Sequence, residues 1–297
     1  MGFINIFVGS YCKMSCADNK FIISGEKEAK FPLEDINSIV IENIQSTIST
    51  ILLTRLAEAN IAVYLCDERH LPAALLLPYN QYYSQRRIYN LQINAKKPLL
   101  KQLWQTIIKQ KISNQAENLK LAGNKNDSGK LIELSKQVQS DDSTNIESIS
   151  ARLYFKALFG KDFDRRSDNG INSCLNYGYA IIRGLIARSL VANGFMTFLG
   201  IHHCNELNNF NLVDDLIEPY RPIVDRIVVR ENLTNIDTNT KKALLNLNNF
   251  DVTIDGKKQL LPRSIEILVD SLINSLQKGG NFLKLPIMSE MLVHNYE

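Results

Sequence analysis

Residues 1–78 alternate short apolar segments with polar turn residues. The segments FINIFV, KFIISG, INSIVIEN and IAVYLCD are rich in isoleucine, valine and aromatic side chains, which favour strands. One helix interrupts them, because residues 47–60 place isoleucine and leucine at helical spacing, with Ser46 or Thr47 as a possible N-cap. The pattern therefore predicts a small, mainly β N-terminal domain.

From residue 79 to residue 297 the pattern changes to helical periodicity. Pro98 divides the first long stretch, and the polar residues 121–131 predict a loop. Residues 171–194 are so apolar that we expect them to form a central helix. VTIDGKKQ predicts a small hairpin. The chain is thus predicted to be an α+β protein of two domains, the mainly β domain 1–78 and a larger all-α C-terminal domain at 79–297.

Composition limits the classes of protein to which the chain can belong. Its net charge is only +3, so any contact with nucleic acid must come from a local basic surface rather than from bulk charge. Arg86 and Arg87, with the lysines that follow between residues 96 and 111, form a basic stretch; such charges usually form a solvated helix face, and a DNA-binding surface is the alternative. No apolar run is long enough to span a membrane and no signal peptide is apparent, which predicts a cytoplasmic protein.

The chemistry-bearing residues are densest between residues 199 and 225. His202 and His203, two of the four histidines, precede a cluster of carboxylates that includes Asp215 and Glu218. Adjacent histidines point in different directions, so at most one of them joins a given site. The carboxylates are spaced to share one helix face, where solvent or Arg221 could equally balance them.

Pro219 complicates the acidic cluster. A proline disfavours helical geometry at the residue before it, here Glu218, and cannot donate a hydrogen bond to a carbonyl one turn back. The sequence leaves open whether Asp215 and Glu218 share a regular helix.

A third segment contributes a further carboxylate. Glu147 lies in the first turn of a helix predicted for residues 146–159 with Asn145 as its N-cap, where an acidic residue is often only a cap. With His203 and the later carboxylates it gives one imidazole and two or three carboxylates, a set suited to Mg²⁺ or Mn²⁺ more than to zinc. Such a metal would polarise a phosphodiester.

Four blocks of sequence carry a family resemblance. They are ExxxAR at Glu147 to Arg152 followed by Tyr154-Phe155, then CLNYGYAIIRGLIARSL, GIHH and DDLIEPYRP. In this order they resemble the CRISPR-associated integrase family, the universal nuclease of spacer adaptation, and especially its type II members. The match covers most of residues 145–226.

The resemblance implies a structure and a set of site residues. It implies a β-sandwich N-terminal domain for dimerisation and partner contacts, a helical catalytic domain and one divalent metal. The residues that match the family's metal ligands are Glu147, His203 and Glu218, with Asp215 at an acidic position that contributes in some relatives. Tyr177 is a candidate catalytic residue, although a tyrosine in an apolar helix is more often part of the core. Residues suited to phosphate contact are Arg165, Arg166 and Arg221, with Arg86 and Arg87 in the basic stretch.

The function implied by the resemblance is metal-dependent transesterification, in which the 3′-hydroxyl of a captured DNA fragment attacks the edge of a CRISPR repeat. The implied partners are double-stranded DNA with 3′-OH ends, repeat DNA, a second copy of the chain and a small dimeric CRISPR-associated protein. Two alternatives remain: a stand-alone metal-dependent endonuclease for branched DNA, and a non-catalytic DNA-binding scaffold.

Overall fold

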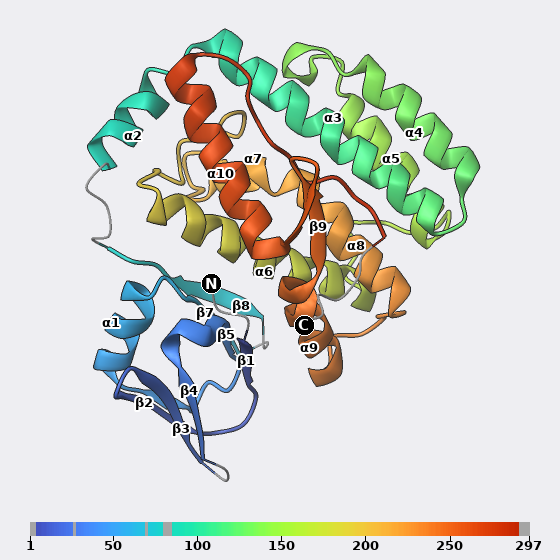
Figure 1. The fold of residues 1–297 in the computed structure, drawn as a ribbon. Coiled ribbons are helices and arrows are strands. Elements are labelled where there is room, and N and C mark those ends of the chain that lie inside the picture. Colours follow the sequence, from blue (N-terminus) through green and yellow to red (C-terminus); the bar gives the residue numbers. More distant parts are fainter. Residues whose placement is uncertain (1–3, 26–27, 69–70, 80–84, 291–297) are drawn as a thin grey trace.

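Two four-stranded sheets form the N-terminal part of the chain (Figure 1). The structure is a computed structural model that describes residues 4–25, 28–68, 71–79 and 85–290. One sheet has the order β1-β5-β7-β8 and is parallel except at β8; its strands are β1 (Ile4–Val8), β5 (Ile36–Ile41), β7 (Ala62–Cys66) and β8 (Pro72–Leu76). The other has the order β4-β3-β2-β6; its strands are β4 (Ala29–Pro32), β3 (Lys20–Ser24), β2 (Lys13–Ala17) and β6 (Thr47–Ile48).

The predicted helix of this region is α1 (Thr50–Glu58), which follows β6. Its N-cap is Ser49 rather than the expected Ser46 or Thr47, because Thr47 and Ile48 pair with β2. Leu52 and Leu56 of α1 are completely buried in the apolar core of this part. A short 3-10 turn, η1 (Leu33–Asp35), connects β4 to β5.

The rest of the chain is helical apart from one hairpin. The described helices are α2 (Gln85–Ile93), α3 (Lys97–Leu121), α4 (Lys125–Gln137), α5 (Ile146–Phe159), α6 (Gly170–Ala192), α7 (Asn211–Leu216), α8 (Arg221–Arg230), α9 (Thr238–Leu245) and α10 (Leu261–Lys278). Three 3-10 turns lie among them: η2 (Ser140–Asp142), η3 (Glu218–Tyr220) and η4 (Asn246–Asn249). The hairpin pairs β9 (Asp251–Ile254) with β10 (Lys257–Leu260), as VTIDGKKQ predicts.

Most predicted helices are confirmed, whereas some of their ends differ, the largest difference being at residues 121–131. Pro98 separates α2 from α3 by lying in the first turn of α3. The predicted loop is too long, because α4 already begins at Lys125, where the side chain of Asn124 accepts the backbone N–H of Asp127. In the part of the chain that the structure describes, no helix is both long and apolar enough to cross a bilayer.

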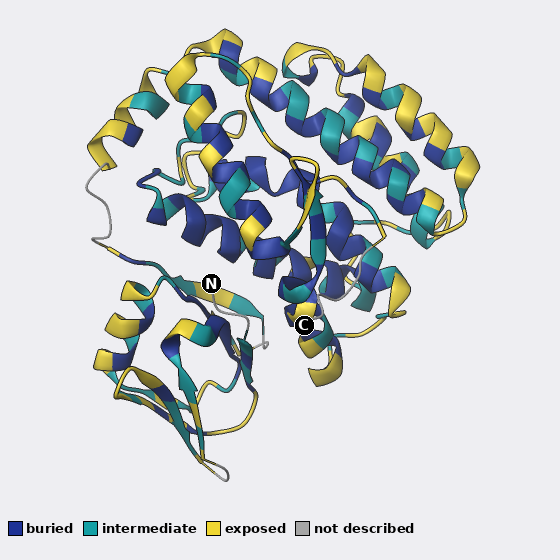
Figure 2. Ribbon diagram, viewed as in Figure 1, coloured by how far each residue is buried: buried dark blue, intermediate teal, exposed yellow. Residues whose placement is uncertain are grey.

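Helix α6 lies at the centre of the helical part and also contacts the N-terminal sheet. Figure 2 shows that it is mostly buried, and it packs against α7, α8, α9 and α10. The hydroxyl of Tyr64 on β7 donates a 2.6 Å hydrogen bond to the carbonyl of Ile181. A Cβ atom at Gly184 would lie 2.1 Å from the Tyr64 ring, so glycine is needed for this close approach. The α+β fold with two structurally distinct parts is confirmed, and the architecture changes between Leu76 and Gln85.

Candidate functional site

Two glutamates from distant parts of the sequence meet at the ammonium group of Lys111. Its Nζ atom lies 2.6 Å from Oε1 of Glu147 and also pairs with Oε2 of Glu218. Arg221 completes the group, because its Nε donates to Oε1 of Glu218 at 2.8 Å. Burial alone would raise the pKa of Glu218, but the charges of Arg221 and Lys111 outweigh it and lower this pKa to about 2. Glu218 is therefore a fixed, ionised carboxylate.

The local sequence explains how Lys111 and Glu147 are positioned. Lys111 follows Ile107 and Ile108 by one helical turn, so it lies on the buried face of α3, which packs against α5 and η3. Glu147 occupies the first turn of α5. The expected N-cap Asn145 has a left-handed backbone and no capping side-chain bond; instead, the carboxylate of Asp142 accepts the backbone N–H groups of residues 146 and 147.

Asp215 organises the GIHH loop rather than joining the lysine-centred group. Its Oδ2 accepts the backbone N–H of Ile201 at 2.5 Å and of His202 at 3.1 Å, and its Oδ1 accepts that of His203 at 3.1 Å. Its side chain is completely buried. A Cβ atom at Gly200 would lie 2.2 Å from the His203 carbonyl oxygen, so the glycine of GIHH allows the loop to close over Asp215.

The two histidines have different surroundings. Nδ1 of His203 lies 2.7 Å from Oδ1 of Asp215, which leaves Nε2 free of this contact. The hydrogen bond to Asp215 is the main cause of a raised pKa of His203, to which the nearby charge of Glu218 also contributes. The ring of His202 instead stacks on Trp104 with a centroid separation of 4.3 Å. Nδ1 of His202 lies 3.2 Å from Oδ1 of Asp141, and the His203 ring meets Trp104 edge-on at 5.6 Å. Each histidine is thus held by a different carboxylate, and that of His203 is the completely buried Asp215.

The break at Pro219 separates Asp215 from Glu218. Helix α7 ends at Leu216, and Glu218 begins the 3-10 turn η3, which leads into α8. The two carboxylates therefore do not share one regular helix, and each contacts a different partner. Asp214 forms a two-bond ion pair with Arg183, at 2.7 and 2.8 Å, so Arg221 is left to pair with Glu218.

The structure does not bring the candidate catalytic residue Tyr177 to this group. Its side chain is buried, and its hydroxyl has no hydrogen-bond partner among the described residues. Burial raises the pKa of Tyr177, and the neighbouring Cys66 and Glu42 raise it further, which places the hydroxyl towards the N-terminal part. The catalytic role of Tyr177 stays a prediction.

Tyr179 lies two residues after Tyr177 in α6, and its side chain contacts residues of the site. Its hydroxyl donates to the buried carboxylate of Asp225, which also accepts a 2.8 Å hydrogen bond from the hydroxyl of Tyr154. The guanidinium groups of Arg221 and Arg165 lie 4.6 and 5.4 Å from the centroid of the Tyr179 ring. Tyr179 therefore supports two cations beside Glu218.

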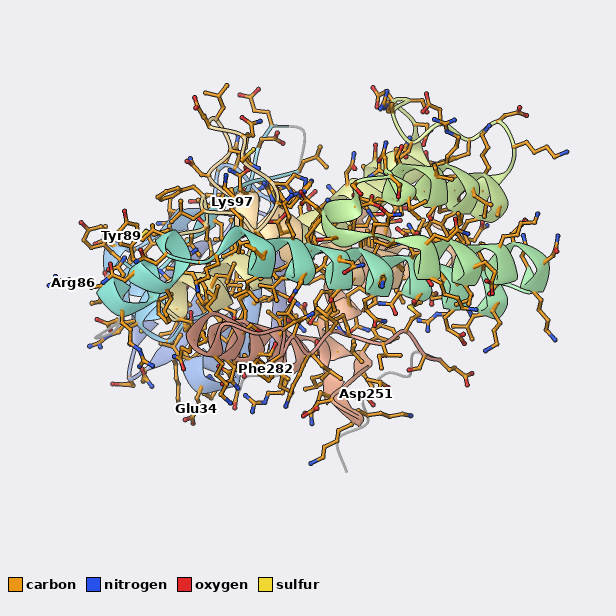
Figure 3. All side chains as sticks on the ribbon, turned by 90° about the horizontal axis from the view of Figure 1, so that it is seen from above. Glu34, Arg86, Tyr89, Lys97, Asp251 and Phe282 are labelled. Carbon is orange, nitrogen blue, oxygen red and sulfur yellow. The ribbon has the colours of Figure 1, made fainter. Side chains whose placement is uncertain are left out.

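The candidate DNA-binding arginines fall into two locations. Arg165 and Arg221 line a cavity of about 270 Å³ that also contains Lys111 and Glu218. Arg166 lines an adjoining groove of about 700 Å³, which shares Arg165 with this cavity. Arg86 and Arg87 instead line a separate groove at α2, and Figure 3 shows Arg86 at the outer end of this helix.

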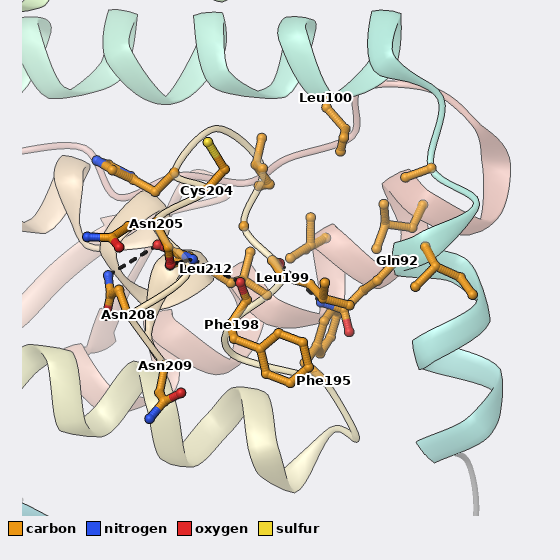
Figure 4. A pocket seen from close by; sticks show the side chains of 18 of the residues that line it. Gln92, Leu100, Phe195, Phe198, Leu199, Cys204, Asn205, Asn208, Asn209 and Leu212 are labelled. Carbon is orange, nitrogen blue, oxygen red and sulfur yellow. Dashed lines mark hydrogen bonds between the residues drawn. The ribbon is translucent and has the colours of Figure 1, made fainter.

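A further hollow of about 740 Å³ is lined by His203. It lies between α2, the start of α3, the loop that contains GIHH and the end of α10. Figure 4 shows apolar and amide side chains around it, among them Phe195, Phe198, Leu199, Asn205, Asn208 and Asn209. Its lining is suited to an aromatic, hydrogen-bonding group.

Comparison with known proteins identifies the family. The model of the family "CRISPR associated protein Cas1" matches residues 6–260. The chain is also 38% identical over 296 residues to the CRISPR-associated endonuclease Cas1 of Neisseria meningitidis serogroup C (strain 8013), covering 96% of each chain. The chain belongs to the Cas1 family. The family predicted from the four sequence blocks is thereby confirmed.

Solved structures agree with this Cas1-family fold. A casposase bound to its integration product superimposes with a TM-score of 0.76 and 21% identity, covering 95% of this chain and 92% of the casposase chain. A Cas6-RT-Cas1–Cas2 complex gives a TM-score of 0.72 and 17% identity, covering 94% of this chain and 36% of the other. At such identities the likeness concerns the fold alone.

Whether this Cas1-family site suits a divalent metal depends on its donor set. Among the described residues, no group of three or more His, Cys, Asp or Glu side chains is already spaced to hold a metal ion. At the centre, the Lys111 ammonium contacts both Glu147 and Glu218. Two carboxylates that converge on one positive charge, with an imidazole nearby, nevertheless form a donor set that fits a hard dication.

Sequence reasoning missed the residues that support the site. In the sequence Lys111 is one of the lysines of the basic stretch, and neither Tyr179 nor Asp225 has a predicted role. Lys111 could have been found, because it falls in register with Ile107 and Ile108 on an otherwise apolar stripe, where an unpaired lysine is not expected. Asp225 and its tyrosines carry no comparable local signal.

Proposed function

We propose that the chain is a metal-dependent DNA endonuclease and integrase of CRISPR adaptation. In the proposed reaction, the 3′-hydroxyl of a captured DNA fragment attacks a phosphodiester of the CRISPR repeat, and the repeat strand leaves as a 3′-hydroxyl. The observation that carries the proposal is the meeting of Glu147 and Glu218 close to His203. Membership of the Cas1 family and the endonuclease name of the Neisseria relative support it.

The proposed metal ligands are Glu147, His203 and Glu218. Bound Mg²⁺ or Mn²⁺ would supply a Lewis acid that stabilises charge on the phosphodiester and favours ionisation of the attacking hydroxyl. We assign Asp215 to hold His203, because both of its oxygens already accept hydrogen bonds from the GIHH loop. A carboxylate bound to the second ring nitrogen fixes the tautomer and orientation of a ligating histidine.

Two grooves that reach the site suit a reaction between two DNA segments. On the Glu218 side, the cavity continues into a basic groove, whose cationic lining residues are Arg152, Lys156, Lys161, Arg165 and Arg166. The hollow beside His203 has aromatic and amide side chains that suit a nucleobase. Phosphate contacts would come from Arg165, Arg166 and Arg221, with Arg86 and Arg87 contacting more distant DNA.

The proposed partners are double-stranded DNA with 3′-OH ends, CRISPR repeat DNA, a second copy of the chain and a small dimeric CRISPR-associated protein. The fold likeness to a chain in a Cas6-RT-Cas1–Cas2 complex supports the last of these. We assign dimerisation and partner contacts to a domain of residues 1–78, catalysis to a domain of residues 79–297, and the cytoplasm as the location.

A joining assay tests the proposal. The protein is incubated with a labelled DNA fragment, a repeat-bearing plasmid and Mn²⁺, and covalent joining of the fragment to the plasmid is measured on a denaturing gel. We expect joining by the wild type, and loss of joining with retained DNA binding in His203→Ala and Glu218→Gln. His202→Ala is the matched control and should keep joining, because the His202 ring stacks on Trp104 and its Nδ1 pairs with Asp141 rather than with Asp215.

The same assay separates the alternatives. Nicking without joining would support a stand-alone endonuclease for branched DNA. Processing that is unchanged in both His203→Ala and Glu218→Gln would support a non-catalytic scaffold that co-purifies with another nuclease.

A further inference from the structure

The central cation of the site is a buried lysine. The side chain of Lys111 is 10% exposed, and its ammonium contacts carboxylates from both α5 and η3. Isolated buried charges are very unfavourable, so such a lysine is retained only where carboxylates compensate it.

The charges and ion pairs of the group indicate that Lys111 and a dication would compete for the same carboxylates. The two glutamates are balanced by Lys111 and Arg221, so the group is already neutral. Adding a dication to these four residues would give them a net charge of +2 beside the largely buried Glu218, which is unfavourable. Both oxygens of Glu218 are also occupied, one by Arg221 and the other by Lys111. A metal can therefore coordinate Glu218 through Oε2 only when Lys111 releases it.

We propose that Lys111 is the resident counter-ion of the metal-free site, and that it is replaced there by the dication. The inference rests on the metal ligands proposed above and adds a role for a residue outside that set. In the absence of metal, the ammonium prevents Glu147 and Glu218 from repelling each other and keeps them together. The Lys111 side chain has room to withdraw into the adjoining cavity of about 270 Å³, whose walls include Gln115 and Arg165. Lys111 is thus a positioning residue that competes with the metal.

Removing the charge of Lys111 should strengthen metal binding. In Lys111→Met a side chain of similar length remains, but the glutamates lose their counter-ion, so a dication no longer has to displace it. Affinity is reduced in proportion to the fraction of molecules that are competent to bind, so we expect Mn²⁺ to bind about tenfold more tightly to the variant. The metal-free variant should unfold at a lower temperature than the metal-free wild type. Saturating Mn²⁺ should raise the Tm of the variant by more than it raises the Tm of the wild type.

The measurement is a Mn²⁺ titration of the full-length protein without DNA, with free Mn²⁺ followed by electron paramagnetic resonance. Lys109→Met is the matched control on the same helix; Lys109 has no ion pair among the described residues, and its loss should leave the affinity unchanged. Lys111→Arg keeps the positive charge and should give no gain in affinity. Circular dichroism verifies that each variant is folded.

Equal or weaker Mn²⁺ binding by folded Lys111→Met would overturn the role of Lys111 while leaving the metal site intact. Absence of Mn²⁺ binding by every protein, wild type included, would overturn the metal site and the role of Lys111 together. If Lys111→Met does not fold, a crystal structure of the wild type with Mn²⁺ decides. Lys111 Nζ should then lie beyond about 4 Å from at least one of the two carboxylates, and retained contact with both would refute the proposal.

Discussion

The most informative single substitution is Asp215→Asn, which keeps the shape of a buried side chain and removes its charge. In the wild type, Asp215 accepts four hydrogen bonds: from the backbone of Ile201, His202 and His203, and from Nδ1 of His203. An asparagine has one acceptor oxygen, and an NH₂ group replaces the other oxygen. The two groups that donate to the replaced oxygen would then face this NH₂ group, which is itself a hydrogen-bond donor.

The orientation of the new amide decides the result. With its NH₂ in place of Oδ2, the N–H groups of Ile201 and His202 would both lose their acceptor. With its NH₂ in place of Oδ1, only the N–H of His203 is left without one, because Nδ1 of His203 can accept a hydrogen bond from the amide. This second orientation is cheaper, and one unsatisfied buried donor lowers the free energy of unfolding by about 1–3 kcal/mol.

The cheaper orientation also changes the tautomer of His203. If Nδ1 accepts a hydrogen bond, the ring proton resides on Nε2, and Nε2 has no free electron pair for a cation. Loss of such a supporting carboxylate typically lowers metal affinity by roughly 10–100-fold, and we expect a loss in this range for Asp215→Asn.

Two measurements test this reasoning in one protein sample. Urea unfolding gives the loss of stability, and Mn²⁺ titration without DNA gives the loss of metal affinity. Asp214→Asn is the control, since it removes the neighbouring charge and weakens the ion pair with Arg183 without touching the imidazole. Wild-type Mn²⁺ affinity in Asp215→Asn would refute the assigned role of Asp215, as would an equal loss of affinity in Asp214→Asn.

Two further substitutions test the interior of the helical part. Tyr177→Phe should leave DNA joining unchanged and keep or slightly raise Tm, because the hydroxyl is buried without a partner among the described residues; a loss of joining in a stable variant would support its catalytic role. Burial raises the pKa of Asp225 to about 6, above its unfolded value, so protonated Asp225 stabilises the fold at low pH and this contribution is lost as pH rises through 6. Between pH 4 and pH 7, the free energy of unfolding of Asp225→Asn should therefore rise relative to the wild type by roughly 1–3 kcal/mol, and a difference independent of pH would contradict the burial of this carboxyl.

The sequence predicted the elements of the fold better than their ends. Apolar periodicity located α6, and the turn residues of VTIDGKKQ located the hairpin, because each signal is local and strong. The ends of α1 and α4 were predicted less well. At α1 the preceding residues pair with β2, a tertiary contact that propensity does not contain. At α4 the cap formed by Asn124 was overlooked in a polar stretch.

The candidate site was predictable as a set of residues and not as a geometry. The four sequence blocks indicated Glu147, His203 and Glu218, and the structure places the two glutamates around Lys111, with His203 nearby. The sequence did not indicate which way each side chain of helix α6 points. Tyr177 and Tyr179 are two residues apart in one helix, yet only the second points to the site, because helical rotation turns the first towards the N-terminal part.

Pro219 explains why neighbouring carboxylates can have separate tasks. On an uninterrupted helix, Asp215 and Glu218 would lie on one face, repel each other and compete for the same cation. Around the 3-10 turn at Glu218 the two carboxylates take different partners: Glu218 contacts Lys111 and Arg221, whereas Asp215 remains under the GIHH loop. One carboxylate is thereby free to meet Glu147, and the other keeps the imidazole of His203 in a single tautomer. The break in the helix thus lets one short acidic segment supply both a candidate metal ligand and the support for another.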